Sequence, residues 1–227
     1  MLKVFVCGLL LQALSVSAAS PDELNETTFQ PGKAIVSFGV NWGRTWKCGR
    51  YDNAQVQELS FRMAPVGPNK LSLELTTPSR LMVENKFIPY ALVLEPGEYV
   101  LTAFDVKFAR SATDVGHIKG DELNLLKDGK PLGGSFTVAP DRVTYIGHFG
   151  LDCGAEPFLW RYYLESRQEF ERWIADLRNK FPFTGRLPAE FKLFETRAFG
   201  NPFALPGASV LEPQQAVQGN GPALGVR

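Results

Sequence analysis

Hydrophobic and polar residues alternate along much of the chain, which is the pattern of half-buried β-strands. The alternation is clearest at Leu71, Leu73 and Leu75, which are separated by polar residues. Residues 34–42 and 56–63 are rich in β-branched and aromatic residues and are bounded by turn-forming residues. We therefore predict a mainly β fold whose strands each bury one face.

Tight turns are expected between several of these strands. Residues 91–94 and 99–104 flank a Glu-Pro-Gly-Glu sequence at 95–98. Pro at the second turn position and Gly at the third are the requirements of a type II turn, so the two stretches are predicted to form a hairpin. Asp128-Gly129 and residues 139–142 predict further tight turns. Other strands are expected over residues 136–138, 143–149 and 158–165.

One amphipathic helix is predicted over residues 167–181. Ser166 and Glu169 have the spacing of a capping box, and Pro182 ends the helix. The helix carries one apolar stripe, formed by Phe170, Trp173, Ile174, Leu177 and Phe181. The expected fold class is an antiparallel β-sandwich with this one C-terminal helix docked on it and an irregular tail.

The two ends of the chain differ from this β-rich region. Lys3, an apolar run over residues 4–16 and small residues at 17–20 form the pattern of a signal peptide cleaved near residue 19. The apolar run is shorter than the roughly 20 residues that a membrane-spanning helix needs. The expected order is a signal peptide (1–19), a polar leader (20–32), the β domain (33–182) and an extension with a Pro/Gly-rich tail (183–227). We expect a secreted or periplasmic protein, or one of the cell envelope, with no transmembrane segment after processing.

Charge and cysteine content support this compartment. The chain has 24 Lys plus Arg and 24 Asp plus Glu, with no basic run, so a nucleic-acid partner has no electrostatic support. Without Cys7 of the signal, Cys48 and Cys153 remain, and free thiols tend to oxidise outside the cell. We predict a disulfide between them, against the alternative of two separate buried thiols. The loop that it closes has about 105 residues, which the chain-entropy model equates with about 4.7 kcal/mol at most.

No motif for catalysis or cofactor binding stands out. The chain has two histidines, His117 in a loop-like stretch and His148 in a predicted strand, without the spacing of a metal site. Nucleophile-elbow, phosphate-binding and dinucleotide-binding motifs are absent from the sequence. We predict no catalytic residue, no metal and no cofactor.

Residues 41–51 concentrate aromatic and cationic side chains. They could stack on sugar rings or hold an anionic group. The alternative, which we favour, is a loop that packs its indoles over the disulfide. The candidate binding residues are Trp42, Arg44, Trp46, Arg50 and Tyr51.

Two stretches resemble a known group of proteins. Residues 94–101 (Leu-Glu-Pro-Gly-Glu-Tyr-Val-Leu) and the later Tyr145-Ile146-Gly147 are similar to segments of uncharacterised bacterial exported proteins with a small β-sandwich of the prealbumin-like or carboxypeptidase-regulatory-like type. The strand-to-helix segment 160–182 is similar too. The resemblance covers residues 34–182, implies a fold and carries no activity.

The function expected from these observations is an exported, non-catalytic binding or envelope-associated module. Its partner would be a protein, a carbohydrate or another envelope component. One alternative is an extracytoplasmic hydrolase with a spatially assembled site, which a pocket holding His148 with a carboxylate would favour. Another is a structural subunit of a surface assembly, which an open sheet edge would favour. Exposed Trp42 and Trp46 would favour binding.

Overall fold

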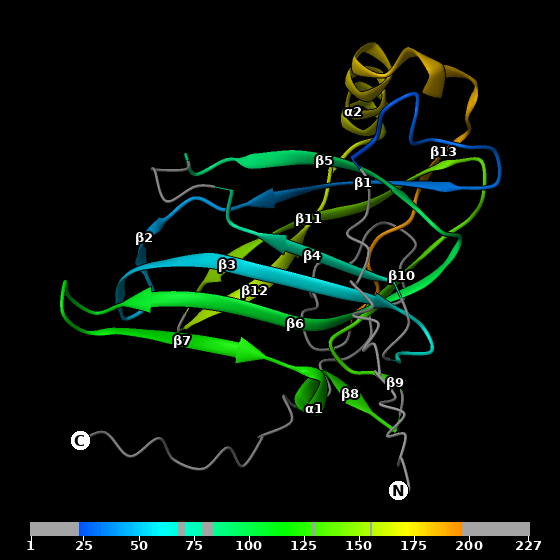
Figure 1. The fold of residues 1–227 in the computed structure, drawn as a ribbon. Helices are drawn as coiled ribbons and strands as arrows, with labels where there is room; N and C mark the ends of the chain where they lie inside the picture. Colours follow the sequence, from blue (N-terminus) through cyan, green and yellow to red (C-terminus); the bar gives the residue numbers. More distant parts are fainter. Residues whose placement is uncertain (1–22, 68–70, 79–83, 129, 155, 197–227) are drawn as a thin grey trace, which may run out of the picture.

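Figure 1 shows the fold in a computed structural model, which describes residues 23–67, 71–78, 84–128, 130–154 and 156–196. The predicted signal peptide and the tail from Gly200 lie outside these residues. The described chain is mainly β, as the alternation predicts. None of its helices is long and apolar enough to span a membrane.

The first large sheet, sheet A, has mixed strand directions. Its strands follow the order β12-β11-β1-β5, and β13 lies beside β11. The strand β1 runs parallel to β11, and β13 also runs parallel to β11, so the prediction of a purely antiparallel fold is wrong. The bounds are β1 (Ala34–Asn41), β5 (Phe87–Leu94), β11 (Val143–Cys153), β12 (Pro157–Tyr162) and β13 (Ala189–Phe191).

The second large sheet, sheet B, is antiparallel and follows the order β10-β6-β3-β2, with β4 beside β3 and β7 beside β6. Its strands are β2 (Thr45–Cys48), β3 (Tyr51–Met63), β4 (Ser72–Thr76), β6 (Gly97–Ala109), β7 (Val115–Gly120) and β10 (Ser135–Val138). A short helix and a two-stranded hairpin complete this side: α1 (Glu122–Leu125), β8 (Leu126–Lys127) and β9 (Lys130–Pro131). Lys127 of β8 pairs with Lys130 of β9, and Asp128 between them has a positive φ of 52°, whereas Gly129 of the expected turn lies outside the described residues.

The turn at residues 95–98 does not form the predicted hairpin. It joins β5 of sheet A to β6 of sheet B, and the two strands pair with different partners, β1 and β3. The turn at 139–142 likewise passes from β10 in sheet B to β11 in sheet A. The residues of a turn determine that the chain reverses there, but they do not determine which strand each flanking segment pairs with. At both turns the chain reverses and passes from one sheet to the other.

Side chains from both sheets meet in one hydrophobic core. Alternate residues of β1, such as Val36 and Phe38, lie there with Leu59 and Phe61 of β3. Leu73 of β4 is buried as its alternation predicts. We call the face of each sheet turned away from this core its outer face.

The outer face of sheet A is covered by α2 (Arg167–Lys180). Both reciprocal bonds of the capping box between Ser166 and Glu169 are present, which confirms the predicted start of the helix. Ile174 and Leu177 pack on this outer face against Ile35, which points opposite to Val36. Trp173 donates a hydrogen bond from Nε1 to Oγ of Ser37, 2.8 Å away.

The fold extends beyond both predicted boundaries of the β domain. Leu24, in the predicted polar leader, is buried in the cluster beneath α2, and its N–H donates to the carbonyl of Ala91. After α2, the 3-10 helix η1 (Pro182–Arg186) leads to β13, and Phe194 enters the central core. Residues 183–196 are therefore part of the fold rather than an extension from it.

Candidate functional site

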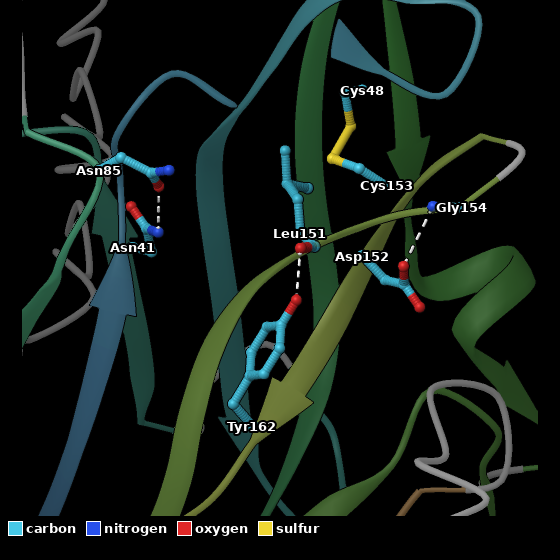
Figure 2. Close-up of a disulfide and its surroundings, with 8 residues drawn as sticks. All are labelled: Asn41, Cys48, Asn85, Leu151, Asp152, Cys153, Gly154 and Tyr162. Atoms are coloured by element: carbon cyan, nitrogen blue, oxygen red, sulfur yellow. Dashed lines mark hydrogen bonds between the residues drawn. A yellow bond between two sulfur atoms is a disulfide. The ribbon is translucent and has the colours of Figure 1, made fainter. Parts of the chain in front are cut away.

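The predicted disulfide is present and joins the two sheets. Cys48 at the end of β2 is bonded to Cys153 at the end of β11, with the two Cα atoms 4.5 Å apart (Figure 2). Nearby, the Tyr162 hydroxyl donates to the carbonyl of Leu151 at 2.5 Å, which ties β12 to β11. The disulfide therefore links the edge strand β2 of sheet B to β11 of sheet A.

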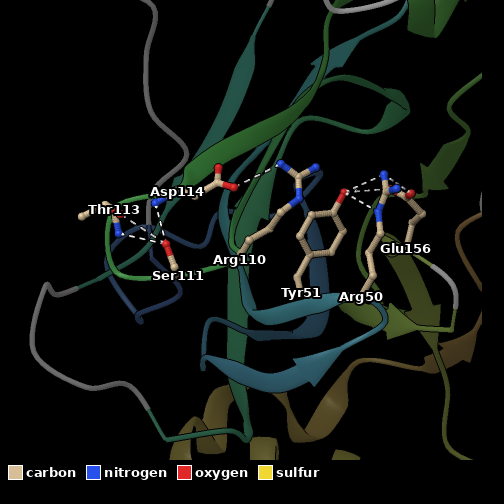
Figure 3. A network of polar contacts seen from close by, with 7 residues as sticks. All are labelled: Arg50, Tyr51, Arg110, Ser111, Thr113, Asp114 and Glu156. Carbon is tan, nitrogen blue, oxygen red and sulfur yellow. Dashed lines mark hydrogen bonds and ion pairs between the residues drawn. The ribbon is translucent and has the colours of Figure 1, made fainter. Parts of the chain in front are cut away.

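A second brace holds the hairpin formed by β2 and β3. Gly49, with φ of 60°, begins its two-residue turn, where a positive φ favours glycine. The buried Tyr51 ring lies between two guanidinium groups, with Arg50 at 5.4 Å and Arg110 at 5.2 Å from its centroid (Figure 3). Its hydroxyl accepts from Arg50 and donates to Glu156, 3.0 Å away. The hydrogen bond to Tyr51 and the charge of Glu156 raise the pKa of Arg50.

The five candidate binding residues therefore fall into different environments. Trp42 is fully buried, and its Nε1 donates to the Tyr90 hydroxyl at 2.8 Å. Tyr51 is buried, and Arg50 forms an ion pair with Glu156 at 2.6 Å. Trp46, in contrast, is 65% exposed, with the guanidinium of Arg44 at 5.4 Å from its ring centroid. The favoured interpretation places both indoles over the disulfide, whereas Trp42 is buried in the central core and Trp46 is largely exposed.

The register of sheet B places Trp46 on an extended surface. Trp46 lies opposite Asn53 of β3, which in turn lies opposite Ala109 of β6. In the next row Gln55 lies opposite Lys107, and Lys107 lies opposite His117 of β7. Because directly opposed residues share a face, these side chains belong to the outer face of sheet B.

The opposite side of the same strands confirms this assignment, because Ala54 and Val106 are fully buried around the disulfide and Val56 is fully buried in the central core. Continuing the register of β2 places Arg44 beside Gln55. We call the resulting surface the cationic face. It consists of Arg44, Trp46, Asn53, Gln55, Lys107 and His117.

Positive charge is in excess on the cationic face. At its border, the Asp105 carboxylate lies 2.8 Å from Nδ1 of His117 and 3.4 Å from Nζ of Lys119. Within the part of the chain that the structure describes, neither Arg44 nor Lys107 has an acidic partner within ion-pair distance. The outer face becomes acidic at this border, because Glu58 lies opposite Asp105 and Glu74 lies opposite Ser60 further along the sheet. The cationic face is therefore a bounded patch at one end of sheet B.

His148 lies on the other side of the molecule, on the outer face of sheet A. A bulge at Gly147, with φ of 101°, brings His148 to the same face as Tyr145. The imidazole packs 4.8 Å from the rings of both Phe87 and Trp173. Its Nδ1 lies over Gly39, where a Cβ atom would stand only 2.5 Å away.

Burial without a charged partner lowers the pKa of His148 to about 4. Among the described residues, its Nδ1 has no hydrogen-bond partner, so no carboxylate orients it. His117, expected in a loop, lies instead in β7 and is paired with Asp105. Neither surrounding is the pocket with a carboxylate that the hydrolase hypothesis requires of His148.

The described residues contain no cluster of three or more His, Cys, Asp or Glu side chains that could hold a metal ion. Comparison with known proteins adds no assignment: no protein-family model, no curated protein and no solved structure matches this chain. The assignment of the candidate site therefore rests on the geometry of the cationic face.

Sequence reasoning missed four members of the cationic face: Asn53, Gln55, Lys107 and His117. They are separated from Trp46 by up to about seventy positions, and only strand register brings them together. The one local signal was the alternation of polar and apolar residues over 53–57. It indicates which side chains point outward but not which residues of other strands lie next to them.

Proposed function

We propose that this protein is an exported β-sandwich binding module that holds an acidic polysaccharide on its cationic face. The exposure of Trp46 beside Arg44, on the same face as Lys107, is the observation that carries the proposal, since neither cation has an acidic partner among the described residues. An isolated exposed tryptophan has little structural value, whereas an indole next to cations and amides has the composition of a sugar-binding surface.

Each component of the face fits one part of such a ligand. The indole of Trp46 offers an apolar plane to the C–H face of a sugar ring. Arg44 and Lys107 supply charge for carboxylates, and Arg44 can bind one with two hydrogen bonds. The side-chain amide of Asn53 can both donate to and accept from hydroxyl groups. That of Gln55, whose Nε2 donates to the Trp42 carbonyl at 2.6 Å, can accept at its oxygen.

The dimensions of the face favour a chain of sugars over a single one. Four neighbouring strands spaced about 4.8 Å apart span about 15 Å from Trp46 on β2 to His117 on β7. The face is open and lies across a sheet, so a polymer can pass over it in either direction. A flat surface of this kind suits binding of an extended ligand rather than enclosure of a substrate.

The test measures binding of polygalacturonate, with neutral dextran as the reference polymer. We expect polygalacturonate alone to bind, with an affinity that falls as ionic strength rises, because exposed charges are screened. Loss of one charged contact in Lys107→Ala or Arg44→Ala should weaken binding by about tenfold, equivalent to about 1.4 kcal/mol.

Lys127→Ala is the matched control, because Lys127 is an exposed lysine on β8, outside the cationic face. It should leave the affinity within about twofold, a change below 0.5 kcal/mol. Equal binding of dextran, or equal losses from Lys107→Ala and Lys127→Ala, would contradict the proposal.

Export is a separate part of the proposal. The Cys48–Cys153 disulfide is typical of proteins in oxidising compartments and supports it. The intact mass of protein recovered from the extracytoplasmic fraction should correspond to cleavage near Ala18 or Ala19. A mature protein that retains Met1 would overturn this part without affecting the binding site.

A further inference from the structure

The strand β12 carries a line of aromatic side chains on the outer face of sheet A. Leu159 lies in the central core, so Phe158, Trp160 and Tyr162 point to the opposite side of the strand. The pairing of Tyr162 with His148 places this side on the outer face. We call Phe158, Trp160 and Tyr162 the aromatic ledge. Alternate residues of a strand lie about 6.8 Å apart, so the ledge spans about 14 Å.

The ledge presents aromatic surface to solvent. Phe158 is 53% exposed and Trp160 is partly exposed. Within the described residues neither ring packs on another aromatic ring, and neither side chain belongs to a hydrophobic cluster of the core. Tyr162 is held in place, because its ring lies 5.6 Å from the Phe87 ring and its hydroxyl donates to the carbonyl of Leu151. Packing in the core therefore does not explain the two exposed rings, and exposed apolar patches of this kind are typical of binding surfaces.

A carboxylate lies beside these rings. Asp152 of β11 lies opposite Phe158, and its Oδ1 accepts a hydrogen bond from the N–H of Gly154 at 3.1 Å. Among the residues that the structure describes, Asp152 forms no ion pair. Burial raises the pKa of Tyr162, and the charge of Asp152 raises it further, as expected for a carboxylate close to the phenol. Asp152 is therefore available to accept hydrogen bonds from a ligand on the ledge.

An amide pair lies on the same part of sheet A. A Cβ atom on Gly150 would stand 3.3 Å from the Tyr162 ring and 3.5 Å from Cβ of Asn41. Asn41 donates from Nδ2 to Oδ1 of the exposed Asn85 at 2.6 Å. Figure 2 shows the two amides together with Tyr162 and Asp152. The aromatic rings are thus accompanied by groups that form hydrogen bonds with hydroxyl groups.

The charge of the ledge differs from that of the cationic face. Arg161, between Trp160 and Tyr162 in sequence, points to the same side of the strand as Leu159 and so away from the ledge. Asp152 supplies a negative charge instead. A polymer of acidic sugars would be repelled by this carboxylate, whereas a neutral sugar would not.

We propose that the aromatic ledge binds an extended chain of β-linked neutral hexoses. Such a chain presents flat C–H faces at regular intervals, and aromatic planes repeated along one strand offer them stacking surfaces. The Asp152 carboxylate accepts hydrogen bonds from the sugar hydroxyl groups, and the Asn85 amide donates to them. The inference is independent of the acidic polysaccharide proposed for the cationic face, since the two surfaces lie on different sheets and differ in charge.

The experiment is an NMR titration of the full chain with cellohexaose, a neutral oligomer of β-linked glucose. We expect the Trp160 indole N–H to shift and the Trp46 indole N–H to stay in place. Phe158→Ala, at an exposed position, should weaken cellohexaose binding by about tenfold while the amide signals of the core stay unchanged. Leu123→Ala is the matched control, because Leu123 is 92% exposed on α1, outside the ledge. It should leave the affinity within about twofold.

Several outcomes would overturn the inference. One is a Trp160 indole signal that stays in place throughout the titration, and another is equal losses of affinity from Phe158→Ala and Leu123→Ala. A shift of the Trp46 indole in place of that of Trp160 would assign neutral sugars to the cationic face. Binding of a glucosamine oligomer with free amines, but not of cellohexaose, would assign the ledge to cations. Ledge signals that change when the free protein is diluted would assign it to self-association.

Discussion

The outer faces of the two large sheets differ in polarity, because the outward residues of sheet A that lie beneath α2 are apolar whereas those at one end of sheet B are polar. On sheet A, Ile35, Val93 and Val143 point outward, and α2 covers them. On sheet B the corresponding positions include Gln55 and Lys107, and this face stays open to solvent. The tryptophans follow the same division, since Trp173 donates to a buried serine whereas Trp46 is 65% exposed.

This difference separates residues that hold the fold from residues available for binding. Apolar outward positions need a covering layer and gain stability from it. Polar outward positions need none, so a large aromatic residue among them gains little from burial. Trp46 is the exposed aromatic residue that lies among cations and amides, which is why the candidate site lies on sheet B.

The largest expected effect comes from the link between the two sheets. Replacing both Cys48 and Cys153 by Ala should lower the free energy of unfolding by about 4 to 5 kcal/mol, because the unfolded chain loses a long closed loop. Denaturant unfolding of the double variant and of the oxidised parent measures this change. A loss below about 1 kcal/mol would show that the packing of the two sheets does not depend on the disulfide.

Next in size is the loss of the covering side chain on sheet A. Trp173→Ala should cost about 3 to 4 kcal/mol, since it leaves a cavity beside His148 and Tyr145 and removes the hydrogen bond to Ser37. Urea titration provides the value. Unchanged stability would mean that α2 is only loosely attached to this face.

Acidification should also destabilise the covered face. The folded pKa of His148 is about 4, below its usual 6.5, so the unfolded state binds more protons between these values. Its contribution is intact above pH 6.5 and is lost as pH falls to 4, by up to about 3 kcal/mol. His148→Phe, which cannot titrate, should flatten this part of the stability profile. Parallel profiles for parent and variant would contradict the account.

The smallest expected change in stability is at Trp46. Trp46→Ala should alter the free energy of unfolding by less than about 0.5 kcal/mol, as exposed positions do. The same substitution should weaken polygalacturonate binding by about tenfold, or about 1.4 kcal/mol. A stability loss comparable with that of Trp173→Ala would place Trp46 in the core and remove it as a binding residue.

Local signals in the sequence were sufficient for some elements and not for others. The capping box and apolar stripe predicted α2 almost to the residue, and cysteine parity predicted the disulfide. Trp42 continues the alternation of Val36, Phe38 and Val40, which are buried in the same core. Trp46 lies beyond Gly43 and outside that alternation, so its exposure follows only from the register of β2 with β3. The parallel pairing of β1 with β11 depends on segments about a hundred residues apart, which turn chemistry cannot indicate.

The most direct test of the central claim maps where an acidic sugar chain binds. In NMR titration with a short oligogalacturonide, the account predicts shifts of the Trp46 indole N–H and of the side-chain amides of Asn53 and Gln55. The Trp173 indole N–H, hydrogen-bonded to Ser37 under α2, should stay in place. Shifts confined to α2 and β13, or no shifts at saturating ligand, would contradict the assignment of the cationic face as a binding site.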